Sequence, residues 1–134
     1  MNILQTEWWT IGIPPEWWAQ QLDEVAVIAD RDDVGAIEIS TLRKEAGEFE
    51  TAEVSAIAKD NAEQSCEWRS VSAGDFAGVY SAYTEEEDVY VREWYLARGP
   101  MLLFITYNCE LENRGMDDAA VDEILSTLSL NTES

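Results

Sequence analysis

The stretch from Phe76 to Glu110 constrains the fold more than any other part of the chain. It contains three runs rich in β-branched and aromatic residues, at Phe76–Thr84, Val89–Ala97 and Met101–Cys109. The short segments Glu85–Asp88 and Arg98–Pro100 separate these runs. Three strands joined by turns this short form an antiparallel meander, which is large enough to organise a hydrophobic core.

Further strands are predicted before the meander. Trp9, Ile11 and Ile13 alternate with smaller or more polar residues, which indicates a first strand with one apolar face. Pro14 and Pro15 end it, since proline cannot donate a hydrogen bond to a neighbouring strand. Glu16–Gln21 is then predicted to be a turn or a short helical piece. Later runs predict three more strands, at Val25–Ala29, Ala36–Leu42 and Ser65–Ser72.

Two segments carry the spacing of a helix. Between Glu50 and Asn61, the apolar residues Val54, Ile57 and Ala58 fall on one helical face. Near the C-terminus, Asp117 and Asp118 precede apolar residues at the i, i+3, i+4, i+7 spacing of an amphipathic helix. These are Val121, Ile124, Leu125 and Leu128.

The predicted order is therefore β-β-β-α-β-β-β-β-α within a single domain covering residues 1–134. Strands grouped by hairpins, with separate helices, are typical of an α+β domain built on an antiparallel sheet. We expect about six to seven strands, with the helices packed on one or both faces.

The element order and the segment Ile13-Pro14-Pro15-Glu16-Trp17 resemble the Mog/PsbP-like (DcrB-like) α/β/α sandwich superfamily. In that group an N-terminal strand runs into a turn containing proline and tryptophan, and a long helix closes the chain. The resemblance covers nearly the whole chain in topology. It implies a binding or adaptor protein without catalysis, as an uncharacterised bacterial member, and it transfers no functional residue.

The charge of the chain restricts its partners. The sequence holds 28 acidic and 8 basic residues, which gives a formal charge of −20. Such a surface repels nucleic acids and anionic membranes and favours partners with basic surface. A strongly charged coat that only keeps the protein in solution is the simpler interpretation. The N-terminus shows no signal-peptide pattern and no run is long enough to span a membrane, so we expect a cytoplasmic protein.

The residues for common catalytic chemistry are missing. The chain has no histidine and no phosphate-binding glycine motif, so we expect no enzyme activity, no cofactor and no metal site. Cys66 and Cys109 are predicted to be buried free thiols. Asp30–Gly35 superficially resembles a calcium loop, but Val34 and Thr41 stand where ligands are needed, so a turn explains it better.

Aromatic and acidic residues form the candidate partner-binding site. Tryptophan is enriched at interface hot spots, and acidic side chains steer basic partners. The candidate residues are Trp8, Trp17, Trp18, Trp94, Glu85, Glu86, Glu87 and Asp88. For the tryptophans the alternative is an ordinary core, and for the acidic run it is a solvated hairpin loop that blocks edge pairing.

We therefore expect a non-enzymatic protein-binding, adaptor or chaperone-like domain, with a homodimer among its expected states. Its partner would be a protein with basic or apolar surface. One alternative is a hydrolase that uses carboxylates with a metal ion. Another is an immunity protein or DNA mimic that binds a basic partner.

Overall fold

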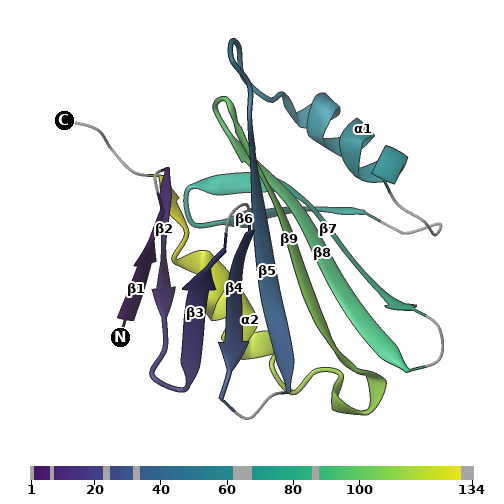
Figure 1. Cartoon of the computed structure of the whole chain (residues 1–134). Coiled ribbons are helices and arrows are strands. Elements are labelled where there is room, and N and C mark those ends of the chain that lie inside the picture. The colour runs from purple at the N-terminus through teal and green to yellow at the C-terminus, as the bar shows by residue number, and fades with distance from the viewer. Residues whose placement is uncertain are drawn as a thin grey trace.

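The computed structural model describes residues 2–6, 8–22, 25–31, 34–61, 68–85 and 88–130. Ten strands, two α-helices and a short 3₁₀ helix follow one another within these ranges (Figure 1). The strands are β1 (Asn2–Gln5), β2 (Trp9–Ile13), β3 (Trp17–Gln21), β4 (Val25–Asp30), β5 (Gly35–Arg43), β6 (Arg69–Ala73), β7 (Phe76–Glu85), β8 (Val89–Arg98), β9 (Met101–Glu110) and β10 (Ser129–Leu130). The helices are α1 (Thr51–Asn61), the 3₁₀ helix η1 (Leu111–Asn113) and α2 (Asp118–Ser126).

The strands form a large and a small antiparallel sheet. The large sheet has seven strands in the order β3-β4-β5-β9-β8-β7-β6, and the small sheet has the order β1-β2-β10. The predicted meander is confirmed as β7, β8 and β9, in which Val79 pairs with Tyr95 and Tyr95 with Phe104. The α+β class with an antiparallel sheet is likewise confirmed.

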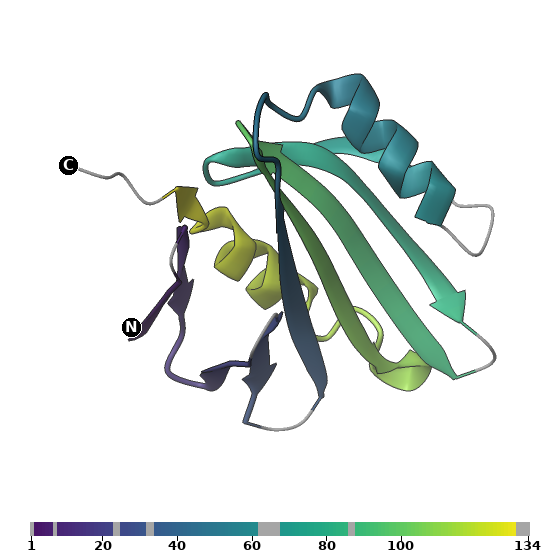
Figure 2. The same ribbon diagram turned by 45° about the horizontal axis from the view of Figure 1, so that its top comes forward.

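The helices lie on opposite faces of the large sheet, because alternate residues of β8 and β9 contact different helices. Trp94, Leu96 and Leu103 share a cluster with the α2 residues Ile124 and Leu125. Their neighbours Tyr95 and Leu102 share a second cluster with Val54 and Ala58 of α1. Figure 2 shows α1 outside the curved sheet and α2 on its inner side.

The inner face of the sheet is closed by α2 and the small sheet together. The predicted spacing of α2 is confirmed, since Val121, Ile124, Leu125 and Leu128 are all buried. Trp9, Ile11 and Ile13 of β2 join the same cluster. The turn between β6 and β7 also contacts the segment that follows α2. Gly74 adopts φ +58° in this turn. The N–H of Asp75 donates a hydrogen bond to the carbonyl of Leu128 at 2.9 Å.

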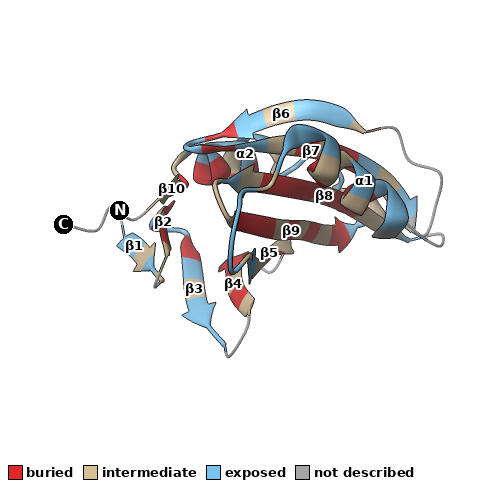
Figure 3. Cartoon of the chain, turned by 90° about the horizontal axis from the view of Figure 1, so that it is seen from above, coloured by how far each residue is buried: buried red, intermediate tan, exposed pale blue. Residues whose placement is uncertain are grey.

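The outer face is covered over only part of its width. Helix α1 contacts β7 and β8 through Val54 and Ala58, whereas β5 presents Leu42, which is 58% exposed. In Figure 3 the buried colour runs along β8 and β9, while β3 is exposed over most of its length. The outer face of the sheet beyond β9 therefore stays accessible.

One predicted element is wrong. Glu16–Gln21 is not a turn or helical piece, because Trp17–Gln21 forms strand β3 paired with β4. The residue types in this segment show no clear alternation of apolar and polar side chains. Pairing with β4 nevertheless buries Trp17, while Trp18 and Gln20 face outward. Strands β1 and β10 were also not predicted; both pair with β2.

The structure also bears on several smaller predictions. The carboxylate of Asp30 accepts a hydrogen bond from the N–H of Val34 at 2.9 Å, as expected for a turn; Asp32 and Asp33 lie outside the described residues. Cys109 is a buried free thiol, and burial raises its pKa; Cys66 lies outside the described residues. None of the described helices is long and apolar enough to cross a membrane.

Candidate functional site

The four predicted tryptophans do not form one surface. Trp17 and Trp94 are buried in the large core, with 4% and 3% of their surface exposed. Trp8 is half-buried against the same core, and the guanidinium of Arg43 lies 5.0 Å from the centre of its ring. Trp18 is 39% exposed on β3. Trp18 is therefore the predicted tryptophan that offers most surface to a partner.

Of the predicted acidic run Glu85–Asp88, the structure describes the side chain of Asp88 alone. Asp88 is exposed at the start of the turn into β8. Glu86 and Glu87 lie outside the described residues, and the side chain of Glu85 is also not described. The role of this run in steering a partner stays a prediction.

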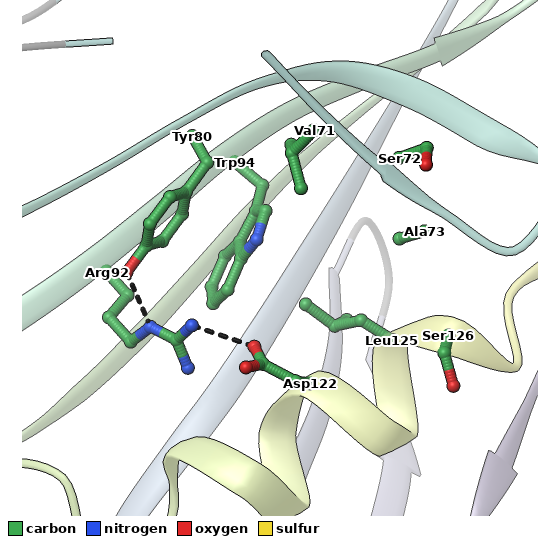
Figure 4. Close-up of a pocket in the computed structure, with 9 residues that line it drawn as sticks. All are labelled: Val71, Ser72, Ala73, Tyr80, Arg92, Trp94, Asp122, Leu125 and Ser126. Carbon is green, nitrogen blue, oxygen red and sulfur yellow. Dashed lines mark hydrogen bonds and ion pairs between the residues drawn. The ribbon is translucent and has the colours of Figure 1, made fainter. Parts of the chain in front are cut away.

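Trp94 lies in the wall of a pocket of about 240 Å³ between β6, β8 and α2, shown in Figure 4. The centre of this site is Arg92, which is 5% exposed. Its Nε donates to the hydroxyl of Tyr80 at 2.9 Å, and its Nη2 donates to Asp122 Oδ1 at 2.8 Å. The guanidinium also lies 4.7 Å from the centre of the Trp94 ring and 5.1 Å from that of Tyr80.

The Arg92 site acts as a clamp between the sheet and α2. Asp118 lies one helical turn before Asp122, and its Oδ1 is 3.5 Å from Arg92 Nη1. Burial lowers the pKa of Arg92, but the hydrogen bonds that Arg92 donates to Tyr80 and Asp122 outweigh this effect, and the pKa of Arg92 lies above its usual value. Because these groups already bind one another, the cluster explains how α2 is held better than it explains a ligand.

The free edge of β3 is a stronger candidate for binding. The N–H of Leu22 donates to the carbonyl of Val25, and the N–H of Arg31 donates to the carbonyl of Glu16. In an antiparallel pair alternate residues exchange hydrogen bonds, so residues 16, 18, 20 and 22 face β4. Ala19 and Gln21 consequently point their N–H and C=O groups away from the sheet. Among the described residues, none pairs with these groups of β3.

A cleft of about 280 Å³ lies beside this edge. Strand β1 forms one wall through Ile3, which is 68% exposed, and β3 forms the other through Trp17, Trp18 and Ala19. Arg31 lies at the cleft and forms no ion pair with another described side chain. We call the outward backbone groups of Ala19 and Gln21, with Ile3, Trp18 and Arg31, the β3 edge site.

The β3 edge site was only partly predicted. Trp17 and Trp18 were chosen for their residue type, but their opposite orientations depend on the strand that the sequence did not indicate. Ile3 was missed because β1 was not predicted. No group of three potential metal-ligating side chains occurs in the described part of the chain.

The architecture is that of a layered α+β protein, with a helix on each face of an antiparallel sheet. A protein from Bacteroides thetaiotaomicron VPI-5482, known from a crystal structure at 1.50 Å, has a similar fold: the TM-score is 0.71 at 17% identity. The match covers 94% of this chain and 46% of the other, so this chain spans about half the length of that protein.

The solution structure of cyanobacterial PsbP (CyanoP) from Synechocystis sp. PCC 6803 is a more distant match. Its TM-score is 0.45 at 10% identity, with 97% of this chain and 92% of that chain covered. No family model matches the sequence, and no curated protein matches it either. Membership of the Mog/PsbP-like superfamily therefore stays a prediction.

Proposed function

We propose that this chain is a non-enzymatic binding protein of the adaptor or chaperone type, and that it binds an extended segment of a partner protein at the β3 edge site. The observation that carries the proposal is the unpaired backbone edge formed by Ala19 and Gln21 beside a cleft with exposed apolar walls. An extended segment that pairs with such an edge gains main-chain hydrogen bonds, and the adjoining pockets select its side chains.

The composition of β3 supports this proposal. Natural proteins protect edge strands with charged residues, prolines or bulges, because an open edge recruits other strands. The sequence of β3, Trp-Trp-Ala-Gln-Gln, contains none of these devices, and Trp18 adds an exposed apolar surface. The edge site is thus built to accept a strand rather than to repel one.

The chemistry of the cleft defines the segment. An apolar side chain fits between Ile3 and Trp18, because both are exposed and would be buried by it. The formal charge of −20 draws in a partner whose overall surface is basic and speeds the encounter at low salt. Backbone pairing then supplies the specific contact.

Proline substitution at Ala19 tests the proposal. A phage-displayed library of random nine-residue peptides is selected on the protein, and the affinity of a selected peptide is measured with the wild type and variants. Ala19→Pro removes the outward N–H while leaving the hydrogen bonds to β4, since edge strands tolerate proline at such a position. We expect the affinity to fall at least tenfold, whereas Ala19→Ser, which keeps the N–H, binds like the wild type.

Two further readouts make the result decisive. Unchanged thermal unfolding of Ala19→Pro shows that its effect is on binding. Failure to select any peptide, or equal affinity of the proline and serine variants, contradicts the proposal. Sedimentation velocity of the protein alone would reveal a second copy at the edge instead, as self-association that Ala19→Pro abolishes.

A further inference from the structure

A groove of about 520 Å³ lies on the outer face of the sheet, beside α1. Its floor consists of Tyr95, Leu102 and Phe104 from β8 and β9. Ile57 of α1 forms one wall, and residues 40–42 of β5 form the other. This volume lies in the range of pockets that hold small organic molecules.

The groove is apolar over most of its lining. Leu42 is 58% exposed at its rim, although leucine side chains gain free energy from burial. The rings of Tyr95 and Phe104 stack with their centres 4.7 Å apart and an interplanar angle of 27°. A ligand with an apolar body would therefore cover Leu42 and lie against an aromatic surface.

One end of the groove is polar and negative. Glu93 is the charged side chain among the described residues that line the groove. The hydroxyl of Tyr83 donates to Glu93 Oε2 at 2.9 Å, which fixes the position of the carboxylate. Glu38 lies on the same face, since Glu38 and Glu93 both pair with Thr106, from the strands on either side of it. Both carboxylates attract a cation.

We propose that this groove binds a small amphipathic amine. The apolar body of the amine lies on Phe104 and Leu42, and its ammonium group faces Glu93. Aromatic rings add a cation–π attraction, and the net charge of the protein concentrates cations near its surface. Carboxylate or phosphate ligands are disfavoured by the same charges.

This inference is independent of the proposed function. The groove and the β3 edge site are formed by different residues, so either one fails without the other. Substitutions at Glu93 and Leu42 leave Ala19 and Gln21 unchanged.

Calorimetric titration with three probes of equal chain length tests the inference. The probes are n-octylammonium, 1-octanol and octanoate, which share an apolar body and differ in charge. We expect octylammonium to bind one site at least tenfold more tightly than octanol, and octanoate not to bind. Glu93→Gln should weaken octylammonium about tenfold and leave octanol unchanged.

Matched variants separate the groove from general attraction. Glu110→Gln removes the same charge from an exposed position on β9, and we expect it to bind octylammonium like the wild type. Leu42→Ser should weaken octylammonium and octanol equally, because it removes apolar contact. Backbone chemical shifts of residues 40–42 and 102–104 should move on titration with octylammonium.

The opposite results overturn the inference. Equal weakening by Glu93→Gln and Glu110→Gln would show attraction by overall charge alone. Equal affinity for octylammonium and octanol would remove the role of Glu93. Absence of both heat and shift changes at millimolar octylammonium would show that the groove is not a site.

Discussion

The two faces of the large sheet are covered to different extents. On the inner face, α2 and the small sheet enclose a cluster of twenty-one buried residues within the described part of the chain. On the outer face, α1 encloses a cluster of five. The inner face therefore buries more apolar side chains, whereas the outer face leaves more of its surface accessible. The placement of the helices on the sheet produces this difference in coverage.

Truncation of a leucine on each face should give the largest contrast. Leu103 is fully buried on the inner face, so Leu103→Ala should lower the free energy of unfolding by about 3 kcal/mol or more. Leu42 on the outer face is 58% exposed, so Leu42→Ala should change the free energy of unfolding by no more than about 0.5 kcal/mol. Urea unfolding followed by tryptophan fluorescence measures both. Equal effects would show that the outer face is closed in solution.

Removal of the carboxylates around Arg92 tests the clamp on the inner face. The double variant Asp118→Asn, Asp122→Asn leaves a buried guanidinium without a counterion, and we expect a loss of about 2 kcal/mol. This value allows for the partial exposure of both carboxylates. Adding Arg92→Met should recover most of the loss, because it removes the buried charge.

The matching ion pair on the outer face joins Lys44 and Glu53, with Lys44 Nζ 2.7 Å from Glu53 Oε1. Both side chains are more exposed than Arg92, so Lys44→Met should leave unfolding unchanged within error. If Lys44→Met lowered the free energy of unfolding as much as the Asp118→Asn, Asp122→Asn double variant, the prediction that the ion pairs of the inner face stabilise the protein more would be wrong.

Alkaline pH should lower the free energy of unfolding through Tyr90 on the inner face. We expect this effect to be smaller than those of the substitutions described above. Burial, together with the nearby Tyr80 and Asp118, raises the pKa of Tyr90 from 10.0 to about 12. The unfolded chain therefore loses this proton first. Stability is complete below about pH 10 and declines as the pH rises toward 12.

Substitution of Tyr90 by phenylalanine checks this interpretation. We expect the free energy of unfolding of Tyr90→Phe to fall less than that of the wild type between pH 9.5 and about 11.5, because the variant has no proton to lose there. Parallel pH profiles for the two proteins would contradict the assignment to Tyr90.

The sequence predicted the elements whose residue types follow a clear period. Helix α2 was found this way, since Val121, Ile124 and Leu125 recur at helical spacing and are buried. The meander was found instead from its runs of β-branched and aromatic residues between short turns. Strand β3 was missed because Trp17–Gln21 lacks alternation, and its conformation depends on pairing with β4.

The candidate sites were harder to predict for a related reason. The run Met101–Cys109 is apolar almost throughout, which is typical of a strand covered on both faces. Phe104 nevertheless lines an open groove, because α1 packs over β7 and β8. Likewise, the type of residue does not separate Trp18 from the buried Trp17.

The position of α2 has a consequence for synthesis of the protein. The helix that covers the inner face comes after all seven strands of the large sheet in the chain. The strands therefore leave the ribosome before α2 does. Until α2 has been synthesised and has docked, the apolar side chains of the inner face stay accessible. Such intermediates aggregate readily. Chaperone dependence in the cell should therefore be set by how quickly α2 docks, and a stop codon before Asp118 should yield insoluble protein.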